Sequence, residues 1–407
     1  MDYHMIHGHQ YDLRRYNHPG GRFVLDRTRG LDVTNLFESY HLSDTARSVL
    51  GRMSCVCCAN KAGMPSVPPK KPFTKEVHDY VLRKHPDPSS RKMHPLKMLV
   101  GLLLWVSTYM YAMVSTHFVI PCVLFSVGQH VVGNRLLHEG SHMSLPGGEH
   151  VNILIGHVCT FPFMPFEGWF FRHVVSHHLH TNDVDRDNDV SVVSYLIPRV
   201  REYYMYILLA LVGAVWWFPT TIIPGLPLSP GIFVILYLAL ECAHIMTMNK
   251  LYTSKDNEVH GARQLWFFGW AMLHMVCYAV VPQYPMRAAI YGGIVGIAFS
   301  FFSALNHLPL LPDGVDPSLD FHEQQVRSSI NYGTGSWFWS MVSFGLNQQV
   351  EHHVLPGVSH GCFVNIRDIC TRHSIPYHEV TFWSSCKMLL GTMFRLGSTQ
   401  SIATNDD

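Results

Sequence analysis

Charge is scarce in this sequence. Lys, Arg, Asp and Glu together make up 14% of the 407 residues, and the formal net charge is +1. A protein that binds nucleic acid usually presents a basic face, so this balance argues against a nucleic-acid partner. Residues 1–15 lack an apolar core, so we expect no cleaved secretory signal. The ten cysteines are scattered without the paired spacing of a zinc site, which favours free thiols in a reducing compartment.

Apolar residues, in contrast, are abundant and arranged in long stretches. They make up 48% of the chain, and several stretches are long enough to cross a bilayer as helices. We therefore expect a mainly α, polytopic membrane protein with four to six spans. A shorter stretch, 150–169, is interrupted by prolines and predicts a re-entrant or interfacial segment. The candidate spans are 98–115, 118–137, 204–223, 232–248, 265–281 and 288–305.

The distribution of Lys and Arg predicts how these spans are oriented. Residues 59–97 carry many basic side chains, whereas residues 224–231, between the third and fourth stretches, carry none. Because basic loops stay on the cytosolic side, we expect the N-terminus in the cytosol and a return there after the second and fourth spans. If the last two stretches both cross, or neither does, the histidine clusters described next all face the cytosol.

Histidine is the most unusual component, with 28 residues in the chain. At that density a bare His-x3-His is expected about twice by accident, but a His-x3-His-His only roughly 0.1 times. Taken singly, each cluster also fits helix-surface or interfacial histidines, whereas the set predicts a metal site. The three clusters are His138 with His142, then His173 with His177 and His178, and finally Gln349 with His352 and His353.

The spacing inside the clusters predicts how they bind. Side chains four apart share a helix face, so His138 and His142 can point at one ion, and the same is expected of His173 and His177. Adjacent histidines differ by about 100° around a helix, so each adjacent pair can serve two neighbouring ions. We therefore expect a two-metal site. Neutral imidazole suits Zn, Cu, Fe and Ni, and spacing does not choose among them.

The N-terminal region, residues 1–58, is polar and predicts a separate module. It contains His18-Pro-Gly-Gly and a later stretch that ends in His41. These motifs resemble the two haem-ligand regions of cytochrome b5, which implies a small α+β domain with His18 and His41 as axial ligands of haem b. Two axial histidines leave no open iron site, so such a haem carries electrons. The segment before His18 is short and the spacing to His41 is one residue tighter than in that family, so we expect a shortened module. Residues 59–96, rich in Pro and Lys, predict a linker.

The combination of this module with three histidine boxes resembles the membrane front-end fatty acid desaturases. The most specific feature is Gln349, where front-end members carry Gln in place of the first histidine of the third box. The resemblance implies a desaturase domain over 97–395, followed by a tail over 396–407, and a cytosolic di-iron site. One further ligand is implied at the end of the sixth stretch, where His307 lies; a satisfied interfacial histidine is the alternative. The implied iron ligands are His138, His142, His173, His177, His178, His307, His352 and His353, with Gln349 bound weakly or through water.

The resemblance also implies a reaction. A cis double bond would be introduced into a polyunsaturated acyl-CoA or acyl-lipid, between an existing double bond and the carboxyl end. Oxygen and electrons from NADH would be consumed, with NADH-cytochrome b5 reductase as partner and the endoplasmic reticulum membrane as location. An unactivated methylene has no acidic proton, which favours redox-metal chemistry. The alternatives are acyl hydroxylation or sphingoid-base desaturation on the same scaffold and, more distantly, a membrane metal carrier.

Overall fold

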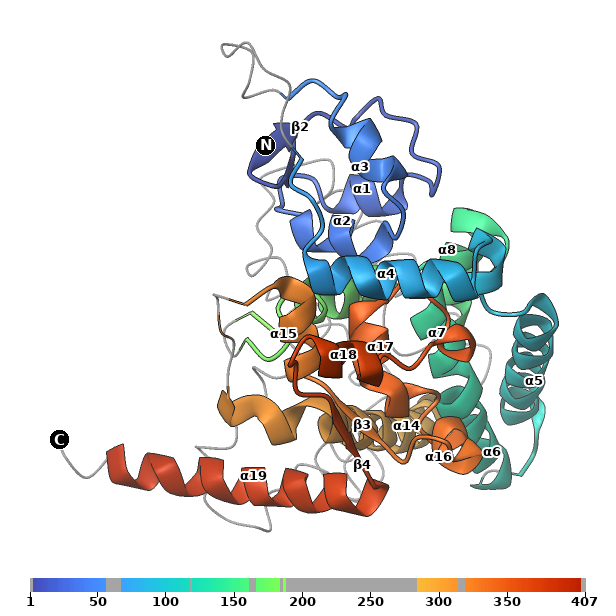
Figure 1. Ribbon diagram of the computed structural model, residues 1–407. Helices are drawn as coiled ribbons and strands as arrows, with labels where there is room; N and C mark the ends of the chain where they lie inside the picture. Colours follow the sequence, from blue (N-terminus) through green and yellow to red (C-terminus); the bar gives the residue numbers. More distant parts are fainter. Residues whose placement is uncertain are drawn as a thin grey trace.

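A computed structural model describes residues 3–55, 67–117, 119–160, 166–183, 186–187, 284–313, 316 and 319–403. The described part is mainly helical, as expected. In Figure 1 a small N-terminal module lies at one end of a larger helical body, α4 runs between them, and α19 lies at the opposite end. The histidine-bearing elements lie in the body beneath the module.

The N-terminal module is a small α+β unit. Its strands β1 (His4–Ile6) and β2 (His9–Tyr11) form an antiparallel hairpin before His18, in the segment that we expected to be trimmed. His7 and Gly8 form the two-residue loop with φ values of 51° and 75°, the positive values that a tight hairpin turn requires. Three short helices follow the hairpin: α1 (Phe23–Arg27), α2 (Thr34–Tyr40) and α3 (Thr45–Leu50).

The segment expected to be a linker contains a packed helix. Helix α4 (Pro72–Lys84) begins with a proline, whose missing N–H is not needed in the first turn. Phe73, Val77 and Val81 recur at helical spacing, and all three are buried in one apolar cluster with residues of the C-terminal part of the chain, such as Val350. Residues 72–84 therefore attach the module to the body instead of only spanning a gap. A short 3-10 turn, η2 (Pro88–Arg91), leads on to the first long helix.

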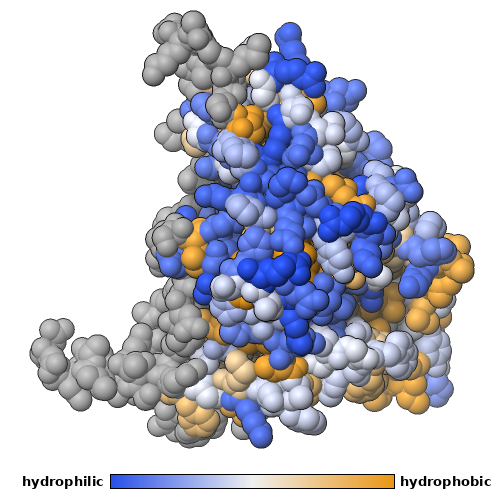
Figure 2. All heavy atoms as spheres, in the orientation of Figure 1, coloured by the Kyte–Doolittle hydropathy of each residue, from blue (hydrophilic) through white to orange (hydrophobic). Residues whose placement is uncertain are grey.

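Only α5 (Pro95–Val114), within the described ranges, is long and apolar enough to cross a membrane. The stretch 118–137 is divided among α6 (Val119–Gly128), the π-helical η3 (Gln129–Gly133) and α7 (Asn134–Ser141), and 288–305 lies within α14 (Tyr284–His307). Figure 2 shows apolar side chains gathered over α5 and α6. The exposed apolar residues of these two helices include Val114 and Val119. The stretches 204–223, 232–248 and 265–281 lie outside the described residues.

Short elements complete the body. The segment expected to be interfacial contains two helices, and the π-helical η4 follows them directly. Strands β3 (Ile330–Tyr332) and β4 (His378–Val380) pair in parallel, and α19 continues into the expected tail. The elements are α8 (Gly148–Thr160), α9 (Phe166–Phe170), η4 (Phe171–His177), η6 (Leu308–Asp313), α15 (Phe321–Arg327), α16 (Trp337–Val342), η7 (Leu346–Gln348), α17 (Gln349–Val354), η8 (His360–Cys362), α18 (Arg367–Arg372) and α19 (Phe382–Ala403).

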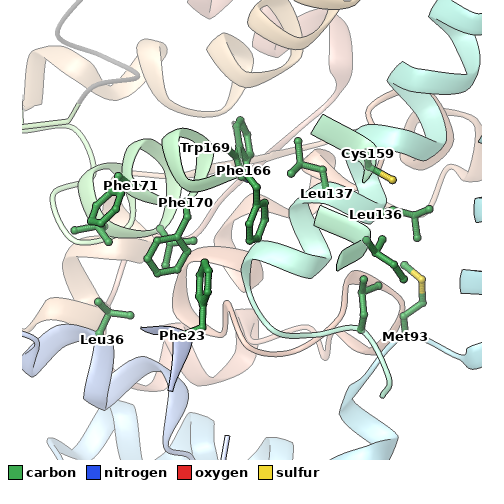
Figure 3. Packing of buried hydrophobic residues seen from close by; sticks show 14 of the residues in the cluster. Phe23, Leu36, Met93, Leu136, Leu137, Cys159, Phe166, Trp169, Phe170 and Phe171 are labelled. Atoms are coloured by element: carbon green, nitrogen blue, oxygen red, sulfur yellow. The ribbon is translucent and has the colours of Figure 1, made fainter. Parts of the chain in front are cut away.

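The module and the body share one apolar core. Phe23 of α1 is buried, and its ring centroid lies 5.6 Å from that of Phe166 and 5.0 Å from that of Phe170 (Figure 3). At the edge of this contact the Arg27 guanidinium lies 3.1 Å from the Glu167 carboxylate. Burial of aromatic side chains dominates interface energetics, so these contacts hold the module in one place on the body.

Candidate metal centre

The structure gathers eight buried histidines into two adjacent groups. In each group the ring nitrogens that can act as ligands lie within 4.8 Å of one another. The first group takes residues from all three boxes, and the second takes one residue from each of the last two boxes together with His307. The first group is His138, His142, His173, His178 and His352, and the second is His177, His307 and His353.

The second histidine box does not lie on a regular α-helix. Its helix η4 is a π-helix, and the His178 amide donates to the His173 carbonyl five residues earlier, at 3.1 Å. The wider turn places His173 and His178 on one side, with their Nε2 atoms 3.3 Å apart. His177 turns to the second group. The prediction that His173 and His177 point at one ion was therefore wrong, because it assumed α-helical spacing. Such π turns are frequent at functional sites.

The two pairs of adjacent histidines, His177 with His178 and His352 with His353, each contribute one residue to each group, as their spacing predicts. His178 and His352 meet in the first group with Nε2 atoms 3.0 Å apart, while His177 and His353 lie in the second. The two groups touch, since the rings of His178 and His353 stack with centroids 4.4 Å apart. This arrangement suits two neighbouring ions.

Gln349 and His307 both lie in the second group. The Gln349 amide lies 3.1 Å from Nε2 of His307 and 3.0 Å from Nε2 of His353. Either its oxygen or its nitrogen can face these atoms after a flip of the amide. If its amide oxygen faces the two Nε2 atoms, Gln349 would add an oxygen ligand to the three imidazoles of the second group. His307 is only 2% exposed, which disagrees with the interfacial alternative.

Hydrogen bonds on the outer nitrogens orient the second group. The Asp187 carboxylate lies 3.0 Å from His177 Nδ1. The Gln325 side-chain oxygen lies 2.8 Å from His353 Nδ1, and the Ser328 carbonyl lies 2.9 Å from His307 Nδ1. A partner on Nδ1 keeps the proton there and leaves the Nε2 lone pair for a metal.

The first group has the polar atoms that a metal would satisfy. Both ring nitrogens of His138 and the Nε2 of His142 are buried without a hydrogen-bond partner. Leaving such groups unpaired costs about 1–3 kcal/mol each. Burial lowers the pKa of His138, and of His352 beside it, well below its ordinary value, and lowers that of His142 to about 3. The imidazoles are thus neutral, as ligation requires, and the donor set fits a transition-metal centre.

Sequence reasoning missed the residues that surround this group. The His360 ring lies 5.0 Å from that of His352 and 4.9 Å from that of His138. Its Nδ1 is 3.2 Å from a carboxylate oxygen of the buried Glu139. Burial alone would raise the pKa of Glu139, but the hydrogen bond from His360 and the charge of Arg135 lower it to about 2. Glu139 is therefore an anion that holds His360 in place. No spacing rule pointed to His360.

The two histidines of the N-terminal module also lie together. The ring centroids of His18 and His41 are 5.8 Å apart. Two imidazoles on opposite sides of one metal ion have centroids about 6 Å apart, for metal–nitrogen distances of about 2.0–2.1 Å. His41 Nδ1 lies 2.9 Å from the Phe37 carbonyl, which leaves Nε2 as the ligand atom. The pair therefore fits axial ligation of a haem.

Fold and site together define a class: a mainly helical oxidoreductase with a two-group histidine metal centre and a fused haem-type module. Comparison with known families agrees. The fatty acid desaturase model matches residues 115–385, and the cytochrome b5-like heme/steroid binding domain model matches residues 2–101. The chain belongs to the fatty acid desaturase family, whose members are membrane-associated oxidoreductases acting on fatty acids. Both resemblances expected from the sequence are confirmed.

Curated relatives match the chain nearly end to end. Delta(5) fatty acid desaturase A of Dictyostelium discoideum is 24% identical, over 99% of this chain and 93% of the relative. Acyl-lipid (8-3)-desaturase of Mortierella alpina is 24% identical, over 93% and 90%. Acyl-lipid omega-13 desaturase of Chlamydomonas reinhardtii is 23% identical, over 98% and 94%. The three alignments thus extend over most of this chain and most of each relative.

Proposed function

We propose that this protein is a front-end desaturase, which introduces a cis double bond between an existing double bond and the carboxyl end of a polyunsaturated acyl chain. The observation that carries the proposal is the pair of touching histidine groups with Gln349 in the second. The reaction removes two hydrogens from the chain and, with O2, two electrons and two protons, forms two waters. Two bound irons would supply the oxidising power that acid–base chemistry lacks.

The chain's own residues provide the setting for this reaction. The eight histidines and Gln349 would hold the metal pair, and Asp187, Gln325 and Ser328 would fix their orientation. The complete burial of the groups keeps water away from the reacting carbon. His18 and His41 would hold haem b, which a NADH-cytochrome b5 reductase would reduce. We propose an endoplasmic reticulum membrane location with four to six spans, with the histidine groups and the N-terminus facing the cytosol.

Expression in yeast fed a panel of polyunsaturated acids tests the proposal. We expect a new fatty acid two mass units lighter than one of the supplied acids, with its double bond on the carboxyl side of the existing ones. Mass spectrometry of derivatised fatty acids locates that bond. A product sixteen mass units heavier would instead show hydroxylation, and a modified sphingoid base would show the other alternative; either result would replace the front-end proposal.

A cavity bordered by Ser359 and Gly361, the two chain neighbours of His360, suits the polar end of the substrate. Its volume is about 470 Å³, and it lies between the start of α5, the η3–α7 region and the loop that carries His360. Lys92, Lys97 and Arg135 line one part of it, and apolar side chains such as Val132 and Leu136 line another. Cations beside an apolar wall match the phosphate and acyl chain of either acyl-CoA or a phospholipid. We propose that this cavity holds the acyl carrier.

Reversing one charge of this cavity should weaken substrate binding. We expect Lys97→Glu to raise KM by roughly three- to tenfold with little change in kcat, because an exposed ion pair contributes up to about 1 kcal/mol and reversal adds repulsion. The effect should shrink at high salt. Kinetics with acyl-CoA and with phospholipid vesicles show which carrier is affected. The control is Lys71→Glu, an exposed charge at the start of α4; equal KM changes in both variants would argue against the cavity.

A further inference from the structure

One residue of the N-terminal module reaches the metal centre. Tyr40 is the last residue of α2, and its hydroxyl oxygen lies 2.6 Å from Nδ1 of His142. The two rings are nearly parallel, with an interplanar angle of 22°. The next residue in the chain is His41, one of the two histidines that fit haem ligation. A single side chain therefore lies between the two proposed redox sites.

The residues next to Tyr40 leave room for its ring, and other contacts of the N-terminal module fix the module on the body. A Cβ atom on Gly357, in the loop after the third box, would lie 3.0 Å from Cδ1 of the Tyr40 ring, so glycine leaves room for the tyrosine there. A Cβ atom on Gly21 would clash with the Glu149 carboxylate, whose oxygen accepts a hydrogen bond from the Phe23 amide at 2.6 Å. With the Phe23 ring packed on Phe166 and Phe170 (Figure 3), the module is docked at three points.

The contact between Tyr40 and His142 also fixes the orientation of the His142 ring, a proposed metal ligand. His142 Nε2 is buried without a partner and belongs to the first group, so Nδ1 is its outer nitrogen. With the proton on Nδ1, His142 donates to the Tyr40 oxygen, just as His177 donates to Asp187. Burial raises the pKa of Tyr40, so its phenol stays neutral. The outer partner of His142 thus comes from the N-terminal module, whereas those of His177, His307 and His353 come from the body.

We propose that Tyr40 links the two redox sites, holding His142 in its ligand orientation and providing a bonded route from His41 to the metal centre. The inference rests on the proposed function. The route runs from His41 through one stretch of backbone and the Tyr40 side chain, then across one hydrogen bond to His142. A haem held by His18 and His41 would supply electrons one at a time, so two transfers along this route would be needed for each double bond, with the reductase as the source of both electrons.

Tyr40→Phe in the full-length protein tests the link, because it keeps the ring and removes only the hydroxyl. Loss of an outer partner typically weakens metal binding or activity roughly 10–100-fold. We therefore expect faster loss of iron to a chelator. In protein reloaded to full iron content, we expect at least tenfold slower re-oxidation of the reduced haem by the metal centre. Haem content and the haem spectrum should stay at the level of the unchanged protein.

The matched control is Tyr3→Phe, which removes a phenol hydroxyl from the same module before β1. A small-molecule reductant that reaches the metal directly should restore single-turnover product in Tyr40→Phe. Haem re-oxidation at the unchanged rate in Tyr40→Phe would overturn the link, as would failure of the direct reductant to restore product. Desaturation by the unchanged protein is measured separately, so failure of the link does not bear on the proposed function.

Discussion

Replacing His353 with alanine is expected to abolish product formation and to remove metal mainly from the second group. That group offers three imidazoles, and the variant leaves only His177 and His307 beside the Gln349 amide. Loss of an outer partner alone costs roughly 10–100-fold in metal affinity or activity, so loss of a ligand should cost more. Metal per chain, measured by plasma mass spectrometry, should fall towards one ion, and the new fatty acid should disappear from the lipid extract.

The neighbouring variant, His352→Ala, separates the two groups. It removes one of five imidazoles from the first group and leaves the second intact. We expect it to lose activity as well but to retain more metal than His353→Ala. The exposed His150 on α8 provides the matched control, and His150→Ala should keep both metal and product. If His353→Ala purified with the full metal content, its assignment as a ligand would be wrong.

Residue types and spacing predicted much of this site. Adjacent histidines pointed to two ions because neighbours on a helix diverge, and that argument holds for any helix with roughly four residues per turn. The position of His307 followed from the resemblance to desaturases. The pairing of His173 with His177 failed for a physical reason: a π turn closes its hydrogen bond over five residues instead of four, and no residue in Phe171–His177 signals it. The pattern of residue types in a helix does not determine where an α-helical turn is replaced by a π turn.

The hydrogen-bond partners of the histidines differ in how far they lie from the histidines in sequence. Asp187 is 10 residues from His177, whereas Gln325 is 28 residues from His353 and Tyr40 is 102 residues from His142. Contacts at such separations depend on how the elements pack, which one sequence does not reveal. Helix α4 shows the opposite case, because Phe73, Val77 and Val81 carry the helical period. The prolines and lysines of residues 59–96 suggested a linker, but the apolar spacing within α4 was the stronger signal.

Replacing His41 with alanine is expected to remove the haem and to stop the reaction when NADH and the reductase are the electron source. His41 Nδ1 is held by the Phe37 carbonyl at 2.9 Å, so its Nε2 is the nitrogen left for a bond to iron. With one axial ligand gone, the b-type spectrum should be lost or changed to that of a singly ligated haem. Absorption spectra of the purified protein measure this directly.

The metal groups should survive this substitution, since His41 contributes to neither. Iron at the histidine groups should therefore stay near its normal level in His41→Ala, and a reductant that acts directly on that iron should restore a single turnover. His9→Ala, in strand β2 of the same module, should keep the haem and serves as the control. An unchanged b-type spectrum in His41→Ala would contradict axial ligation by this residue. The comparison with Tyr40→Phe then separates two roles of adjacent residues, because that variant should keep the haem while the haem is re-oxidised more slowly and iron is lost to a chelator faster.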